Sequence, residues 1–125
     1  MASHRPDLGN VRVLVVEDDE SLRDFLNLSL GYVGAAVTAT ANLHEGLAVL
    51  DTLQPDVIVF NLAVDDAGLP LAQAAQDRDI PAIGLTARLR DPAVDVLLRT
   101  HGVRLVDEFD HQAVVLAVED AVKMA

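Results

Sequence analysis

The segment DVIVFN, residues 56–61, decides the fold of this chain. Its apolar run, residues 57–60, leads straight into Asn61 without the alternation of a half-exposed strand. Such runs are typical of strands that are buried on both faces, as in parallel sheets. Similar β-rich runs occupy residues 11–16, 35–40, 81–86 and 103–106. The chain therefore contains a series of short, deeply buried strands.

The stretches between these runs have helical spacing of their apolar residues. We expect helices at about 20–30, from 42, at about 69–77, from 91 and at about 110–123. The first has Phe25 and Leu26 on its apolar face and is expected to end at Gly31. The second begins with Asn42 followed three residues later by Glu45, which is a capping-box arrangement.

Strand and helix alternate five times, which predicts an α/β fold with a parallel sheet covered on both faces. At this length the expected architecture is a doubly wound, five-stranded parallel sheet of order 2-1-3-4-5, a flavodoxin-like fold. Residues 1–9 show no periodicity and are expected to form a flexible N-terminal arm. Residues 10–125 then make one domain.

The composition excludes several classes of function. The net charge is -11, with 9 basic against 20 acidic residues, which argues against nucleic acid and against an anionic membrane surface. The absence of cysteine excludes disulfides and thiolate metal sites. The early apolar run VLVV is too short for a signal-peptide core or a transmembrane helix. We therefore expect a cytoplasmic protein.

Ligands of doubly wound sheets bind outside the carboxyl ends of the strands. Here those ends read VVEDDES, VFNLAVDD, GLTAR and LVDEF. The acidic run after the first strand would repel phosphate, so a flavin- or nucleotide-binding module is disfavoured. A phosphatase-like α/β enzyme is another class, but its Asp-x-Asp pattern would begin with Glu17 here, and its lysine is absent.

These strand ends resemble the receiver domain of two-component response regulators. The resemblance covers residues 11–123 and rests on VRVLVVEDDESLRDFL, QPDVIVFNLAVDDAG and IPAIGLTA. In that family an acidic pair binds Mg²⁺, and an Asp after the third strand accepts a phosphoryl group from a histidine kinase. A hydroxyl and a lysine at the next strand ends then contact the phosphate.

The resemblance assigns the Mg²⁺ pair to Glu17 and Asp18, with Asp18 as the direct ligand and Glu17 acting through water. It assigns the hydroxyl to Thr86 and the acceptor position to Asn61. A neutral amide is not a nucleophile that forms an acyl phosphate. We therefore expect no catalytic residue, no required cofactor and at most weak Mg²⁺ binding.

Other departures from the family pattern point the same way. The lysine position matches Asp107, in the stretch Asp107-Glu108-Phe109, and acid there repels phosphate. The aromatic switch position matches Arg104. The segment between Asn61 and Thr86 is short for the family, so we expect a shortened third helix.

The resemblance implies an atypical, stand-alone receiver domain in signal transduction that acts by phosphorylation-independent protein contact and is not an enzyme. The partner would be a signalling protein, such as a histidine kinase or an output protein, and a homodimer is also allowed. We expect contact through the fourth helix, fifth strand and fifth helix, at Arg104 and Leu116. The alternatives are a receiver that is phosphorylated on Asp65 or Asp66, and the phosphatase-like enzyme.

Overall fold

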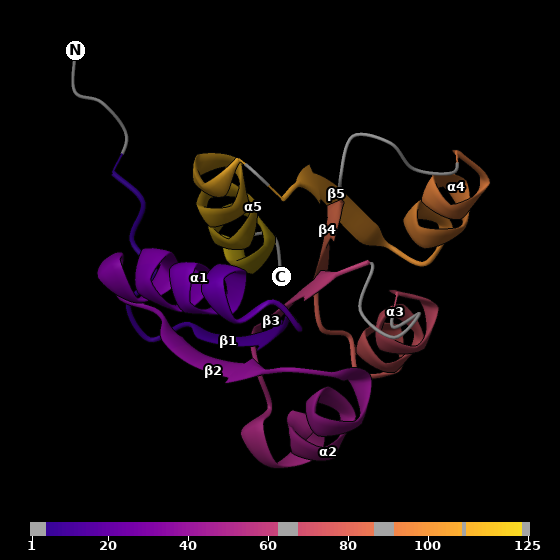
Figure 1. Ribbon diagram of the computed structural model, residues 1–125, viewed down its shortest axis with the longest axis horizontal. Coiled ribbons are helices and arrows are strands. Elements are labelled where there is room, and N and C mark those ends of the chain that lie inside the picture. Colours follow the sequence, from indigo (N-terminus) through magenta and orange to yellow (C-terminus); the bar gives the residue numbers. More distant parts are fainter. Residues whose placement is uncertain (1–4, 63–67, 87–91, 109, 124–125) are drawn as a thin grey trace.

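The protein is a five-stranded parallel sheet covered by helices on both faces (Figure 1). The computed structural model describes residues 5–62, 68–86, 92–108 and 110–123, except the side chain of Val94. The strands are β1 (Arg12–Val16), β2 (Ala36–Thr40), β3 (Val57–Asn61), β4 (Ala82–Thr86) and β5 (Val103–Asp107). Their order is β2-β1-β3-β4-β5, which confirms the sequence prediction.

Two layers of helices enclose the sheet. On one face, α1 (Glu20–Tyr32) and α5 (His111–Lys123) share a core with the strands. On the other face lie α2 (Leu43–Leu53), α3 (Gly68–Asp77) and α4 (Pro92–Thr100). None of the helices within the described residues is long and apolar enough to cross a bilayer.

The first helix ends later than the sequence predicts. It continues through Gly31 to Tyr32, and the left-handed turn comes at Gly34, where φ is 106°. The N–H of Gly34 donates to the carbonyl of Gly31 at 3.0 Å, and the N–H of Ala35 donates to that of Leu30 at 3.1 Å. The expected stop at Gly31 is wrong because a helix interior tolerates glycine, whereas only the later glycine adopts the positive φ that reverses the chain.

The segment before β1 packs against the domain from Asp7 onward. Leu8 is buried, and its N–H donates to the carbonyl of Val33 at 2.8 Å. The N–H of Asp7 donates to Glu119 Oε2 at 2.8 Å. Glu119 is buried on α5, where its carboxylate accepts this hydrogen bond and pairs with Lys123 Nζ at 3.6 Å. Of the predicted flexible arm, residues 1–4 lie outside the described residues.

The second helix begins as predicted. Asn42 is its N-cap, and its Oδ1 accepts a hydrogen bond from the N–H of Glu45 at 2.9 Å. The Glu45 carboxylate reaches back to the N–H of Ala41 at 3.0 Å, one residue before the position of an ideal capping box. The predicted start of α4 at residue 91 lies outside the described residues, and the helix begins at Pro92.

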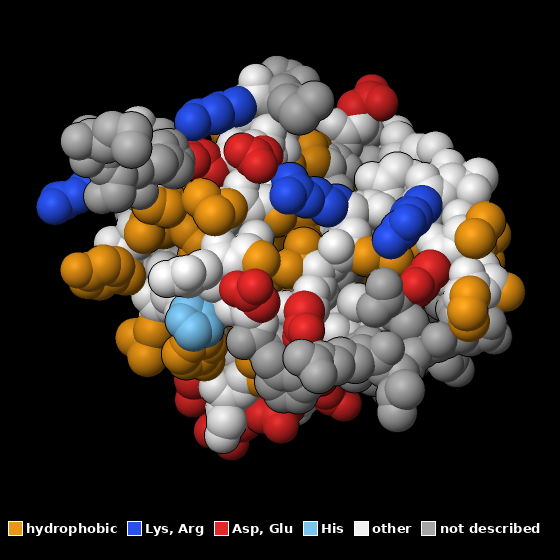
Figure 2. Space-filling model, turned by 90° about the horizontal axis from the view of Figure 1, so that it is seen from above, with side chains coloured by type: hydrophobic (Ala, Val, Ile, Leu, Met, Phe, Trp, Pro, Cys, Tyr) orange, Lys and Arg blue, Asp and Glu red, His pale blue; other side chains and the backbone are white. Residues whose placement is uncertain are grey.

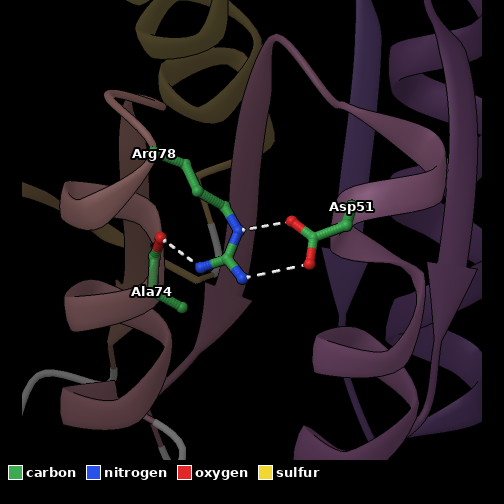
Figure 3. A network of polar contacts seen from close by, with 3 residues as sticks. All are labelled: Asp51, Ala74 and Arg78. Carbon is green, nitrogen blue, oxygen red and sulfur yellow. Dashed lines mark hydrogen bonds and ion pairs between the residues drawn. The ribbon is translucent and has the colours of Figure 1, made fainter.

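A bidentate ion pair joins α2 to the end of α3 (Figure 3). Arg78 Nε donates to Asp51 Oδ1 at 2.9 Å and Nη2 to Oδ2 at 3.3 Å, while Nη1 donates to the carbonyl of Ala74 at 2.9 Å. Hydrogen bonding to this guanidinium lowers the pKa of the Asp51 carboxyl. The pair adjoins Pro55 and Pro81, so it lies at the amino ends of β3 and β4, opposite the predicted site.

Two helical glycines, Gly46 and Gly31, allow a matched test of how closely α2 packs against β1. A Cβ at Gly46 would lie 2.8 Å from Val16 Cγ2, whereas a Cβ at Gly31 would meet nothing within 4 Å. We expect Gly46→Ala to lower the free energy of unfolding by about 1–3 kcal/mol, because α2 would be pushed from β1. Gly31→Ala should raise it by up to about 1 kcal/mol through helix propensity. Urea unfolding measures both, and equal effects would contradict the close approach of α2.

Candidate functional site

Polar side chains meet where β1, β3, β4 and β5 end. Glu17 follows β1, Asn61 ends β3, Thr86 ends β4 and Asp107 ends β5. Asn61 is paired in register with Leu85, and Thr86 with Asp107. Glu17 is 1% exposed and Asn61 is 7% exposed, so both point into the protein rather than into solvent. The fold thus gathers the sequence-predicted positions at one edge of the sheet.

The side chain of Asn61, at the end of β3, is a hydrogen-bonded amide. Asn61 Nδ2 donates to Glu108 Oε2 at 3.0 Å, across 47 residues of sequence. The N–H of Glu108 donates to the carbonyl of Thr86 at 3.0 Å, which fixes the turn after β5 above the end of β4. A hydrogen bond to a charged acceptor contributes about 1.5–3 kcal/mol. The ends of β3 and β5 are therefore joined by a direct contact.

Sequence reasoning missed this role of Glu108. It identified an acidic stretch at the lysine position but did not connect Glu108 to Asn61. A signal was present, because an amide at the end of one strand and a carboxylate after another form a complementary donor and acceptor. Only the neighbouring order of β3, β4 and β5 brings the two side chains together.

The carboxylate of Glu17 is only half satisfied. Its Oε1 accepts a hydrogen bond from the N–H of Asp19 at 3.0 Å, while its buried Oε2 has no hydrogen-bond partner. Burial raises the pKa of Glu17, and neighbouring Asp18 adds to the rise. The N–H of Asp19 and the amide of Asn61 act in the opposite direction, since they favour the charged form.

The other acids of this run have different environments. Asp18 is exposed. Asp19 is the N-cap of α1, and its Oδ1 accepts a hydrogen bond from the N–H of Leu22 at 3.0 Å. Arg23 does not neutralise Glu17 through its carboxylate, because Nη1 donates to the Glu17 backbone carbonyl at 2.9 Å. Helix capping therefore accounts for Asp19, but not for the buried carboxylate of Glu17.

The oxygen donors of Glu17, Asp18 and Asn61 fit a hard divalent cation, although only two of the three are charged. Mg²⁺ prefers oxygen ligands and retains several waters. Glu17 supplies a buried oxygen without a partner, Asp18 supplies an exposed carboxylate, and Asn61 supplies a neutral amide. Within the described part of the chain, no three Asp, Glu or His side chains form a potential metal centre. The predicted metal ligands therefore comprise two carboxylates, those of Glu17 and Asp18.

The predicted partner residues lie in different environments. Arg104 is exposed on β5, and its Nη1 pairs with Asp120 Oδ2 on α5 at 3.4 Å. Leu116 is exposed on α5 and lines a groove with Phe25 and Leu28 of α1. The apolar surface continues from α5 onto a neighbouring helix that the pattern of α5 alone does not reveal. Asp65 and Asp66 lie outside the described residues.

The half-satisfied Glu17 predicts a pH-dependent stability. Burial raises the pKa of Glu17 in the folded protein above its ordinary value of 4.5. The contribution of Glu17 to stability therefore falls as the pH rises from 4.5 through its folded pKa. In chelator-containing buffer at pH 7, Glu17→Gln should stabilise the fold by about 1 kcal/mol, the scale of one unsatisfied buried group. This gain should vanish as pH falls toward 4.5. Urea unfolding across pH tests this, with the exposed Asp24→Asn as control, and a pH-independent gain would contradict the assignment.

Similarity to known proteins covers most of the chain. The chain is 33% identical over 88 residues to the transcriptional regulatory protein TrcR of Mycobacterium tuberculosis, which covers 68% of this chain and 34% of TrcR. It is 38% identical over 81 residues to the virulence transcriptional regulatory protein PhoP of Salmonella choleraesuis, with coverage of 62% and 36%. The chain thus spans about a third of the length of these regulators. It is also 33% identical over 98 residues to an uncharacterised 14.6 kDa protein from the sodA1 3′ region of Leptolyngbya boryana, covering 74% of this chain and 75% of that protein.

Solved structures share the same fold. The receiver domain of Francisella response regulator 1452 matches with a TM-score of 0.81 and 23% identity, over 92% of this chain and 98% of that one. A response regulator receiver domain protein from Clostridium thermocellum matches with a TM-score of 0.81 and 17% identity, over 91% and 95%. No family model matches the chain. The acidic strand end, the sheet order and these relatives together show that the chain belongs to the receiver-domain family of two-component response regulators.

Proposed function

We propose that this receiver domain signals through protein–protein contact without a phosphoryl group at residue 61. The observation that carries the proposal is the hydrogen bond from Asn61 Nδ2 to Glu108 Oε2. The amide of Asn61 is not a nucleophile that forms an acyl phosphate, and its N–H donates to an acceptor within the domain. The position is thereby built into the fold rather than presented to a phosphodonor.

The charges around Asn61 support the same proposal. Glu17 follows β1, Asp107 ends β5 and Glu108 follows β5, so a phosphoryl group at residue 61 would meet like charge. The one lysine of the sequence, Lys123, ends α5. A helix of this length is about 20 Å long, and α5 begins just after Glu108, so the Lys123 ammonium at its far end lies far from Asn61.

The same residues define what the domain retains. Glu17 and Asp18 would hold Mg²⁺ weakly, because two carboxylates and a neutral amide provide less charge than the family's site. When bound, the cation would neutralise part of this acidic edge. The partner that we propose is a signalling protein, such as a histidine kinase or an output protein, which contacts the face formed by α4, β5 and α5. Arg104 would take part in that contact.

A phosphorylation assay tests the proposal directly. Incubation with acetyl phosphate and Mg²⁺, followed by intact-mass analysis, should give no gain of a phosphoryl group, because the nucleophile is missing. A receiver that carries an Asp at the acceptor position serves as the positive control. A hydroxylamine-labile gain would contradict the proposal, and peptide mapping would then decide between Asp65 and Asp66.

Replacing the amide of Asn61 by a carboxylate tests its pairing, as hydrogen-bond donor, with the acceptor Glu108. In chelator-containing buffer, Asn61→Asp should lower the free energy of unfolding by about 2–3 kcal/mol, because it loses the donor and places a second charge beside Glu108. The double variant Asn61→Asp with Glu108→Gln should recover most of this loss, since it exchanges donor and acceptor. Glu108→Gln alone should change stability by less than about 1 kcal/mol, because its amide oxygen still accepts the bond.

The same variant tests whether the switch is intact. Asn61→Asp adds a third carboxylate, so its Mg²⁺ affinity should rise. Addition of beryllofluoride should nevertheless leave the NMR signals of residues 86–109 almost unchanged, because Asp107 replaces the family lysine. Large cooperative shifts in those residues would show that only the acceptor is missing, and they would contradict a permanently phosphorylation-independent domain.

A further inference from the structure

The amide of Asn61 lies between two carboxylates that follow strands on opposite sides of β3. Glu17 follows β1 and Glu108 follows β5, while β3 pairs with β1 and β4. Asn61 Nδ2 donates to Glu108 Oε2 at 3.0 Å. Burial raises the pKa of Glu17, and the nearby Asn61 amide counteracts this rise. Because an ionised carboxylate only accepts hydrogen bonds, both acids use the N–H₂ end of this amide.

A divalent cation at Glu17 and Asp18 needs the other end of the amide. Glu17 Oε2 is buried and has no hydrogen-bond partner among the described residues, so it is the oxygen that a cation beside Asp18 would meet. Only the amide oxygen of Asn61 could join it as a ligand, because the N–H₂ group carries positive partial charge. Turning that oxygen toward Glu17 turns the nitrogen away, since both belong to one planar group. The amide can therefore serve the two acids or a cation, but not both at once.

The turn that contains Glu108 leads directly into α5. The N–H of Glu108 donates to the carbonyl of Thr86 at 3.0 Å. Two residues later, Asp110 Oδ1 accepts a hydrogen bond from the N–H of Ala113 at 3.0 Å, which caps the first turn of α5. The side chain of Glu108 is tied to the end of β3 by Asn61. Loss of that tie would change the support of the turn from which α5 begins.

The charge of the domain favours a cation as the ligand of the strand ends. The net charge is -11, and Figure 2 shows acidic side chains gathered along the lower border of the visible face. A surface of one sign raises the local concentration of counter-ions. The same field opposes a phosphoryl donor, which is itself an anion.

We propose that the hydrogen bond between Asn61 and Glu108 opens when Glu17 and Asp18 bind a divalent cation, so that cation binding releases the turn into α5. This inference rests on the proposed function, to which it adds an input other than a phosphoryl group. The coupling is reciprocal: the hydrogen bond weakens cation binding by the same factor by which the bound cation weakens the hydrogen bond. The face of α4, β5 and α5 thereby depends on the occupancy of the strand ends.

An NMR titration of the wild-type chain with MgCl₂, without any phosphodonor, gives the first test. The backbone signals of residues 17–19 should shift saturably as the cation binds. The side-chain amide signal of Asn61 and the backbone signals of residues 108 and 110–114 should shift with the same midpoint, because one event moves them all. NaCl at equal ionic strength should produce no saturable shift.

The variant Glu108→Asp tests the competition without a change of charge. Its carboxylate is withdrawn by one methylene, so the bond from Asn61 is weakened. Mg²⁺ affinity should rise by about two- to tenfold, the range equivalent to one net hydrogen bond, and the shifts at residues 110–114 should shrink. Glu20→Asp is the matched control, because it makes the same change in an exposed glutamate close to Asp18. It should leave both the affinity and the shifts unchanged.

Three results would overturn the inference. These are the absence of any saturable Mg²⁺-dependent shift in the wild-type chain, saturable shifts at residues 17–19 while residues 61 and 110–114 stay unmoved, and a Glu108→Asp protein that binds Mg²⁺ no more tightly than the Glu20→Asp protein. None of these measurements contains a phosphodonor, so the proposal about residue 61 is decided separately by the phosphorylation assay.

Discussion

Complete burial of β3 is the constraint on which the rest of the structure depends. Residues 57–60 are all fully buried, and β3 pairs with β1 on one side and β4 on the other. A strand without an exposed face requires helices above and below the sheet, which the α1–α5 layer and the α2–α4 layer provide. Parallel pairing then places all strand ends at one edge. Any polar residue that ends β3 is consequently held among those of its neighbours.

Because residue 61 is held among the other strand ends, it matters whether its side chain is an amide or a carboxylate. Asn61 is nearly buried, so its amide requires an internal partner, and Glu108 provides one. Glu17 has no such compensation for one of its oxygens, and its carboxylate carries the cost of burial. The strand ends therefore combine the hydrogen-bonded pair of Asn61 and Glu108 with a buried acid, Glu17, that has one unsatisfied oxygen. The domain thus keeps the receiver architecture, with Asn61 and Glu108 hydrogen-bonded at the strand ends.

Charge and apolar surface are separated on the outside of the molecule. The acidic residues lie at the carboxyl ends of the strands, whereas the exposed apolar side chains of α1 and α5 flank a groove. Among the described residues that line this groove there is no Asp, Glu, Lys or Arg. The ring of Phe25 on α1 packs edge-to-face against the ring of His111 on α5, with 4.9 Å between the ring centroids, and it remains partly exposed. Helix α1 thus serves the core with one stripe and the surface with another.

The sequence by itself determined the strand and helix pattern and the position of Asn61 at a strand end, because hydrophobic periodicity and strand-end residues are local features. The sheet order followed from the alternation of strands and helices, which favours a doubly wound sheet at this length. It also located the cap at Asn42. The tertiary structure alone decided that Glu108 is the partner of Asn61, that Glu119 is buried and that Leu116 belongs to a groove. Each of these depends on which distant segments become neighbours, and the spacing of residues within a single helix or strand carries no information about the side chains that pack against it from elsewhere.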